Sequence, residues 1–315
     1  MPQPTLSSVH VNAALNNVAI GYKPQQYVLD QVFPIIPVMK ESDYYFSWDQ
    51  GPIRMNNAKK VRPGDRAPRG GFTVSSTTYT TDCWKFAWAI PDRIRANMDG
   101  AISAEVNTTM RVMDQILLSR ESTIATLLTT TANWTNTAAA GGFWDSGLGS
   151  PLGEIETANL AVQAATGMPA NTVVMSWKVS RALRKHPELL EHLSVMLGTG
   201  QRSAGAGPKF ATKDVIADMF DIPNIIITPA RYNSAVEGQT ASYADVMTDT
   251  VWVGYVAPAP AIDEPSAGYV FQVKAPMIRT WREDAEEQDV VEGQVNFVAK
   301  ATLAGAGYTI TNVLA

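Results

Sequence analysis

The stretch "IPDRIRANMDGAISAEVNTTMRVMDQILLSRESTIATLLTTT" (residues 90–131) sets the expected architecture of this chain. Its apolar residues recur mostly at every third or fourth position, which is the spacing of one apolar stripe along an α-helix. The pattern predicts one amphipathic helix, about 60 Å long at roughly 1.5 Å per residue. The stripe residues are Ile94, Met98, Ile102, Val106, Met110, Met113, Leu117, Ile124 and Leu128.

The beginning of this helix has suitable residues, and its interior has one possible break. Pro91 and Asp92 suit the first turn, where proline is tolerated and an aspartate can accept free backbone N–H groups. The whole helix would be longer than an ordinary domain of this size is wide, which favours a structural beam. Asp99-Gly100 offers an alternative, because glycine inside a helix costs about 1 kcal/mol and the pair could separate two helices.

The composition of the 315-residue chain indicates a globular protein with few surface charges. It is 45% hydrophobic and 17% charged, against a typical charged fraction of about 25%, so we expect partner chains to cover part of the surface. The net charge of -5 argues against general nucleic-acid binding through a basic face. No apolar run approaches the roughly 18 residues of a membrane span, and no signal-peptide pattern is present, so a cytoplasmic protein without a membrane partner is expected.

Sequence motifs for catalysis, metal binding and phosphate binding are largely missing, so the sequence predicts no enzyme, no cofactor and no metal site. Cys83 is the single cysteine, which excludes an intrachain disulfide, and it is expected to be a small buried residue. His186 and His192 lie six positions apart and would face different sides of a helix. The loop "GTGQRSAGAGPK" (198–209) lacks the Lys-Ser/Thr that ends a phosphate-binding P-loop.

The first 90 residues divide into an arm and a ribbon. Residues 1–40 contain five prolines, which predict an extended arm without a long regular element. The segments "YYFSW" (44–48) and "FTVSSTTYTTDCWKFAWAI" (72–90) are rich in aromatic and β-branched residues and predict strands. The basic tip between them (54–71) has too few apolar residues for a core, so it is either a flexible excursion or a ribbon that docks on another molecule.

Residues 154–260 alternate helical segments with short buried strands, which predicts a compact α/β domain around a central sheet. The glycine-rich segment 132–153 before it indicates a linker. The expected helices are 155–166, several turns within 177–197 and 212–220, and the expected strands are 172–176, 224–228 and 250–256.

The last segment, 268–315, has strand-like composition and is expected to pair beside the long helix. It contains an acidic run that lacks the alternating aspartates of a calcium loop. A ribbon of cations and a run of anions could dock head to tail between subunits, and contacts of that kind close into rings or shells. The carboxylates of the run are Glu283, Asp284, Glu286, Glu287, Asp289 and Glu292.

The order of these parts resembles the major capsid protein of tailed bacteriophages, the Hong Kong ninety-seven type fold that encapsulin shells share. The passage "NLAVQAATGMPANTVVMSWKVSRALRKHPELLEHL" (159–193) resembles the entry into that family's axial domain, and "VEGQVNFVAKATLAGAGYTITNVL" (291–314) resembles its final strands. The resemblance implies an α+β capsid fold. Its expected parts are an N-terminal arm (1–42), an extended E-loop β-hairpin (43–89), a peripheral domain with the long spine helix and a β-sheet (90–153), an axial α/β domain (154–260) and return strands of the peripheral domain (261–315).

The function implied by the resemblance is that of a virion head protein. Copies would form pentamers and hexamers of an icosahedral shell around double-stranded DNA, contacted without sequence specificity, after assembly in the host cytoplasm. Portal and decoration proteins are further expected partners, and scaffolding would come from a separate protein or be absent. The alternatives are an encapsulin-like container and an isolated α/β enzyme.

The residues expected at contacts between subunits are charged. The alternative for each is a solvated charge, because an exposed ion pair contributes only about 0–1 kcal/mol. The expected contacts join the cations Lys59, Lys60, Arg62, Arg66 and Arg69 to the carboxylates Glu283, Asp284, Glu286, Glu287 and Asp289.

Overall fold

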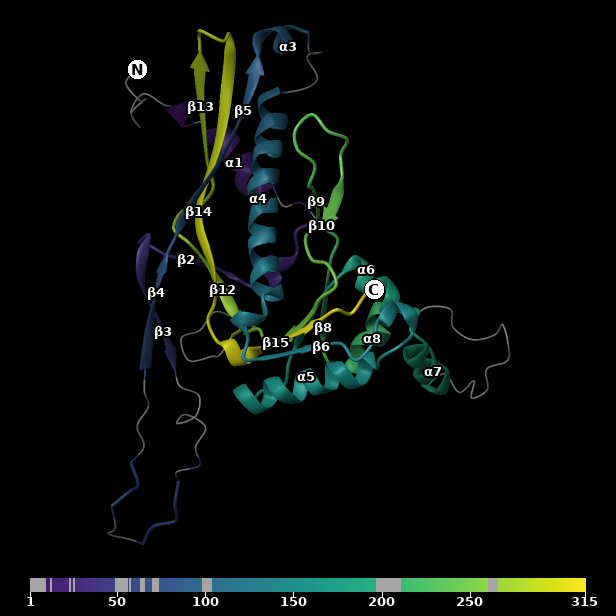
Figure 1. Cartoon of the computed structure of the whole chain (residues 1–315). Coiled ribbons are helices and arrows are strands. Elements are labelled where there is room, and N and C mark those ends of the chain that lie inside the picture. Colours follow the sequence, from purple (N-terminus) through teal and green to yellow (C-terminus); the bar gives the residue numbers. More distant parts are fainter. Residues whose placement is uncertain are drawn as a thin grey trace.

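Figure 1 shows the computed structural model of the chain as a tall layer of strands with one long helix, beside a lower layer covered by shorter helices. The predicted features at Met98, Asp99-Gly100, Ile102 and 198–209, and part of the predicted tip 54–71, lie outside the described residues. The structure describes residues 10–11, 13–22, 24, 26–48, 56, 58–62, 66–69, 74–97, 104–196, 211–259 and 266–315.

The tall layer is a six-stranded sheet built around one long strand, β14. This strand pairs antiparallel with β13, β12 and β5, while β1 and β2 complete the edges. Side chains of β14 alternate between buried and partly exposed positions, as expected for a strand with one face on a core. The strands are β1 (His10–Val11), β2 (Ile35–Pro37), β5 (Asp82–Pro91), β12 (Gly268–Gln272), β13 (Met277–Glu283) and β14 (Gln288–Ala301).

Helix α4 (Ala104–Thr129) lies across this sheet, against β14 and β5. Met113 and Ile124 of the predicted stripe are buried there, and burial of such a side chain contributes about 1.5–3 kcal/mol. Gly293 of β14 allows the close approach, because a Cβ atom at that position would lie 2.7 Å from Cγ1 of Val112. The predicted stripe is confirmed only in part, because its Val106, Met110 and Leu117 are partly buried and its Ile94 is 53% exposed.

The prediction of a single helix over 90–131 is wrong at its N-terminal end. Strand β5 extends through Pro91, and helices α3 (Asp92–Ala96) and α4 follow. Ile90 is buried in β5 opposite Asp289 of β14. Pairing with this distant strand overrides the helical spacing that the local sequence shows. Helix formation does begin directly after Pro91, as predicted.

The N-terminal segment contains a helix that the proline pattern did not predict. Helix α1 (Ala13–Gly21) contacts α4 and β13, and its Leu15 and Ala19 are buried in the core. The five prolines of residues 1–40 all lie outside this helix, so they bound it without interrupting it. A single 3-10 turn, η1 (Leu29–Gln31), follows.

Strands β3 (Ser42–Trp48) and β4 (Val74–Thr80) form a separate antiparallel ribbon that extends away from the body (Figure 1). The predicted strand over 72–90 is thus two strands, because the chain leaves the ribbon as β4 and enters the six-stranded sheet as β5. The ring of Tyr79 stacks on Phe271 of β12, with 4.6 Å between centroids. This contact attaches the base of the ribbon to the sheet.

The lower layer is a five-stranded sheet in the order β6-β15-β11-β7-β8. Val173 and Met175 of β7 lie in a core with α5 to α8, whereas Val174 between them belongs to the core that contains α4. The predicted strands 172–176 and 224–228 are confirmed. The elements are β6 (Asn136–Ala139), α5 (Pro151–Thr166), β7 (Thr172–Ser176), α6 (Trp177–Leu183), α7 (Pro187–Met196), α8 (Lys213–Phe220), β8 (Asn224–Thr228), β11 (Val251–Gly254) and β15 (Gly307–Thr311).

The last strand does not return to the tall sheet. β15 pairs with β11 and with β6, so the expected assignment of 261–315 to the peripheral return strands is wrong for this strand, and the predicted linker 132–153 contains β6. Both faces of β15 are covered, because Tyr308 and Ile310 face the core with α5 and Thr309 donates to the Leu128 carbonyl of α4.

Short elements complete the fold. A hairpin of β9 and β10 rises from the lower layer beside the long helix in Figure 1 and was not predicted. Their bounds are β9 (Arg231–Asn233), β10 (Tyr243–Asp245), η2 (Thr131–Asn133), η3 (Trp144–Ser146) and η4 (Ala304–Ala306).

Candidate functional site: subunit contact surfaces

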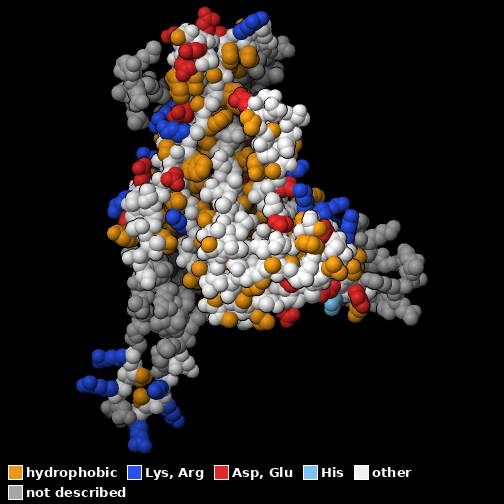
Figure 2. Space-filling view, viewed as in Figure 1, with side chains coloured by type: hydrophobic (Ala, Val, Ile, Leu, Met, Phe, Trp, Pro, Cys, Tyr) orange, Lys and Arg blue, Asp and Glu red, His pale blue; other side chains and the backbone are white. Residues whose placement is uncertain are grey.

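The predicted cations gather at the far end of the ribbon, where Figure 2 shows them clear of the body. All five are exposed, and within the described ranges none makes an ion pair. Their charges are thus available to another molecule. We call Lys59, Lys60, Arg62, Arg66 and Arg69 the basic tip.

The predicted carboxylates lie at the turn between β13 and β14, at the opposite end of the molecule from the ribbon (Figure 1). Asp284, Glu286 and Glu287 are exposed there, whereas Glu283 and Asp289 are partly buried. The structure therefore separates the two predicted charge sets by the full height of the tall layer, and contacts between them within one chain are ruled out. We call these five carboxylates the acidic turn.

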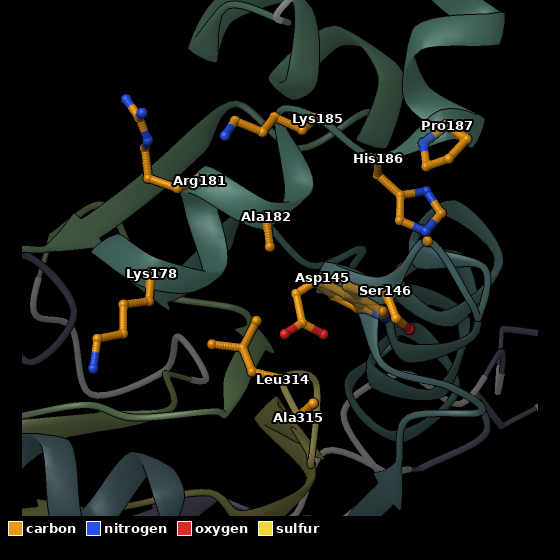
Figure 3. Close-up of a pocket in the computed structure, with 12 residues that line it drawn as sticks. Asp145, Ser146, Lys178, Arg181, Ala182, Lys185, His186, Pro187, Leu314 and Ala315 are labelled. Atoms are coloured by element: carbon orange, nitrogen blue, oxygen red, sulfur yellow. The ribbon is translucent and has the colours of Figure 1, made fainter.

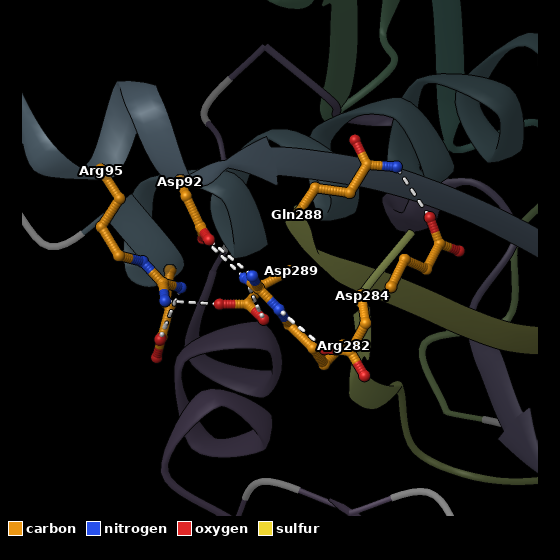
Figure 4. Close-up of polar contacts among 8 residues, drawn as sticks. Asp92, Arg95, Arg282, Asp284, Gln288 and Asp289 are labelled. Atoms are coloured by element: carbon orange, nitrogen blue, oxygen red, sulfur yellow. Dashed lines mark hydrogen bonds and ion pairs between the residues drawn. The ribbon is translucent and has the colours of Figure 1, made fainter. Parts of the chain in front are cut away.

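Arg282 of β13 forms ion pairs that connect the acidic turn to α3 of the same chain (Figure 4). Its guanidinium donates to both carboxylate oxygens of Asp92 in α3, at 2.6 Å and 2.5 Å, and lies 3.4 Å from Asp284. Arg95 of α3 pairs with Asp289, which also lies 3.5 Å from Arg282. The hydrogen bonds from Arg282 hold the pKa of Asp92 below its usual range. These contacts fasten the turn to α3.

The remaining carboxylates of the acidic turn differ in the hydrogen bonds and ion pairs that they form within the chain. Glu283 accepts hydrogen bonds from Gln288 at 2.7 Å and from the indole of Trp281 at 3.0 Å, which lower its pKa. Glu286 and Glu287 make no ion pair within the described part of the chain. They are therefore the anions of the turn that are most available to a neighbour. The sequence signal for Arg282 was its place as the single cation in the run.

A buried carboxylate in α4 anchors the N-terminal arm. Glu121 is only 2% exposed, and its two oxygens accept from the backbone N–H groups of Val28 at 3.1 Å and Leu29 at 3.0 Å. Burial raises the pKa of Glu121 to about 7. The sequence carried one signal, because Glu121 lies on the apolar stripe between Leu117 and Ile124.

Two further contacts fix the same part of the arm on α4. Asp30 pairs with Arg120, and the Tyr27 hydroxyl donates to Asp114 at 3.0 Å. Burial, with Asp114 nearby, raises the pKa of the Tyr27 hydroxyl. Because these groups lie beside the Glu121 contacts, the arm and the helix form one polar joint.

Cys83 and His186, the residues considered for chemistry from the sequence, both lie within the described ranges. No group of three or more His, Cys, Asp and Glu side chains there could hold a metal ion, and no described helix has the length and apolar character that a bilayer crossing requires. Cys83 is exposed, contrary to expectation, because Trp84 and Phe86 on the other face of β5 take the core side. His186 is buried and accepts from the Glu188 N–H at 3.3 Å.

Comparisons with known proteins place this geometry among capsid proteins. No protein-family model matches the chain. A major capsid protein of Burkholderia phage BcepMu is 22% identical over 314 residues, which cover 96% of each chain. The similarity is weak per residue, but it extends over nearly all of both sequences.

Solved structures agree on the arrangement of the elements. A phage-related protein from Bordetella bronchiseptica RB50 superimposes with a TM-score of 0.72 at 22% identity, over 96% of this chain and 97% of the other. The capsid protein of cyanophage P-SCSP1u gives a TM-score of 0.60 at 8% identity, over 94% and 90%. At such low sequence identities, the structural similarity establishes the fold alone. The chain has the α+β fold of the tailed-phage capsid proteins, the Hong Kong ninety-seven type.

Proposed function

We propose that this chain is a major capsid protein whose copies assemble into pentamers and hexamers of an icosahedral phage head around double-stranded DNA. The proposal rests on the ribbon and its basic tip. The tip has no hydrophobic core of its own and forms no ion pair within the described residues. It lies at the opposite end of the molecule from the acidic turn. Such a projection is useful only if a neighbour covers it. The similarity to a phage major capsid protein over 96% of both chains supports the same function.

The parts of the molecule take the following roles in this proposal. The six-stranded sheet with α4 is the peripheral domain, the five-stranded sheet with α5 to α8 is the axial domain, and the β3–β4 ribbon with its tip is the E-loop. The segment that contains α1 and η1 is the N-terminal arm. A structural subunit of this kind needs no catalytic site or cofactor.

The proposed contacts join the basic tip of one subunit to the acidic turn of the next. Glu286 and Glu287 are the preferred partners, because Arg282 and Arg95 already neutralise Asp284 and Asp289. Scaffolding, portal and decoration proteins would be further partners, and assembly would take place in the host cytoplasm. The net charge of -5 favours non-specific and limited contact with the packaged DNA.

Electron microscopy of the expressed chain tests the proposal, with the double variant Arg62→Glu/Arg66→Glu as the perturbation. We expect shells from the wild type and none, or misassembled ones, from the variant, because two attractive contacts per interface become repulsive. The double variant Lys213→Glu/Lys274→Glu changes the net charge equally at other exposed sites and is expected to assemble. Normal shells from Arg62→Glu/Arg66→Glu would contradict the proposed contact.

The encapsulin-like container predicts shells without a genome. Heads with an attached tail or filled with DNA in infected cells would exclude it. A wild-type chain that stays monomeric at all concentrations would contradict both shell functions.

A further inference from the structure

Helix α7 begins with a histidine as its N-cap. His186 directly precedes the helix, and its carbonyl accepts from the Leu190 N–H at 3.1 Å, the first hydrogen bond of the helix. Nδ1 of its imidazole accepts from the backbone N–H of Glu188 at 3.3 Å, as the side chain of an N-cap does. Pro187 has no N–H, so Glu188 supplies the first N–H group of α7. The imidazole therefore caps this group.

The cap requires a neutral imidazole. Nδ1 of histidine has one lone pair, which accepts a hydrogen bond only while that nitrogen carries no proton. A proton on Nδ1 and the N–H of Glu188 thus compete for the same lone pair. Ser150 and Ser176 cap α5 and α6 with hydroxyl groups, whereas histidine changes its charge between pH 5 and 8. Of these three caps, only the one on α7 can be removed by a proton in that range.

The surroundings of His186 favour the neutral form of the ring while the junction stays closed. The residue is 2% exposed, and its Nε2 is buried without a hydrogen-bond partner among the described residues. Figure 3 shows the ring directed toward η3, while the side chains of Arg181 and Lys185 extend away from it. Gly147, which follows η3, packs on Pro187, because a Cβ atom there would lie 3.2 Å from Cγ of the proline. Since a buried charge without partners is costly, a protonated ring favours opening of this junction.

Charged groups from several elements surround the ring. Oε2 of Glu188 lies 4.0 Å from Nδ1, beyond hydrogen-bond distance, and Oε1 accepts from the Ser150 hydroxyl at 2.7 Å. A protonated ring that attracts Glu188 would draw this carboxylate away from Ser150, the N-cap of α5. Glu154 of α5 accepts from the indole of Trp144 in the same region, and Lys178 is paired with Asp245. The charged side chains that line the hollow of about 570 Å³ beside His186 are Asp145, Lys178, Arg181 and Lys185, and the last residue, Ala315, lines it too.

We propose that His186 is a proton-sensitive cap of α7. Its neutral imidazole holds the first turn of α7 against α5 and η3, and uptake of one proton at Nδ1 breaks the bond to the Glu188 N–H and opens that turn. Acidification from about pH 7.5 to 5.5 therefore loosens the start of α7. The inference concerns a single chain and does not rest on the proposed shell function.

Hydrogen exchange of the Glu188 amide, followed by NMR in the unassembled chain at about pH 7.5 and 5.5, tests the cap. After correction for the intrinsic exchange rate, we expect protection to fall about tenfold at the lower pH. A tenfold change corresponds to about 1.4 kcal/mol, and a lost N-cap costs about 0.5–2 kcal/mol. In His186→Asn, protection should be equal at both pH values, because asparagine is a strong N-cap that does not titrate. His192→Asn is the matched control, since His192 is exposed on the same helix, and it should behave like the wild type.

The second readout is the tautomer of the His186 ring, taken from its nitrogen chemical shifts. We expect the proton on Nε2 at about pH 7.5, because Nδ1 is the acceptor. This measurement uses the wild type, so it tests the cap whether or not His186→Asn folds. Protection of the wild-type amide that is independent of pH, an equal pH dependence in His186→Asn, or a proton on Nδ1 at about pH 7.5 would overturn the inference. Shell formation by the wild type is decided separately by electron microscopy.

Discussion

Replacing Glu121 by alanine is the most direct test of the joint between the arm and the long helix. The substitution leaves the backbone N–H groups of Val28 and Leu29 without their acceptors. Leu29 is fully buried, so water cannot replace the lost bonds without disturbing the core. An unsatisfied buried donor costs roughly 1–3 kcal/mol, and two of them amount to about 4 kcal/mol.

The cost of Glu121→Ala should depend on pH in a defined direction. Burial raises the pKa of Glu121 from 4.5 to about 7, so the folded chain binds this proton more tightly than the unfolded chain. The free energy of unfolding of the wild type therefore rises as the pH falls from about 7 to 4.5, and this contribution is lost above pH 7. A shift of this size corresponds to about 3 kcal/mol.

Urea unfolding of the unassembled subunit at about pH 5 and pH 8 measures both effects. We expect Glu121→Ala to cost about 4 kcal/mol at the lower pH and about 3 kcal/mol less at the higher pH. Glu105→Ala is the matched control in the same helix, because Glu105 is half exposed and its ion pair contributes at most about 1 kcal/mol. An equal cost of Glu121→Ala at both pH values, or a larger cost at pH 8, would refute the reasoning.

Three other substitutions have defined outcomes. Tyr79→Ala removes the ring stacked on Phe271, so the ribbon should detach from the sheet and become sensitive to limited proteolysis. The free energy of unfolding in urea should fall by about 3 kcal/mol. An unchanged digestion pattern would contradict this prediction. Gly293→Ala places a Cβ atom 2.7 Å from Val112, so the free energy of unfolding should fall by about 1–3 kcal/mol, and equal stability would mean that the helix can move away. Arg282→Ala removes the donor that lowers the pKa of Asp92, so an NMR titration should show that pKa rising toward its ordinary value, while an unchanged pKa would assign the shift to another group.

The arrangement of charges explains how a chain with few charged residues could assemble accurately. The basic tip and the acidic turn lie at opposite ends of the molecule. Complementary patches increase the rate of encounter and select the orientation of the partner more than they add to affinity.

Local patterns in the sequence determined most elements of this protein. The helical spacing within residues 104–129 and the alternation of helices with the buried strands at 172–176 and 224–228 were readable without coordinates, because periodicity reports which face of an element is buried. The two opposite charge sets were also evident from composition. Their exposure and their separation were not, because both depend on how the chain is folded.

Only the tertiary structure decided which elements pair and which charges remain free. Ile90 fits a helical stripe and a strand equally well, and its pairing opposite Asp289 settled the choice. The last strand joined β11 and β6 in the lower layer, and Arg282 reached Asp92 across 190 positions of sequence. The physical reason is common to all three cases: a residue's local preference is weak beside a contact made with a distant segment, and no local pattern encodes that segment's identity.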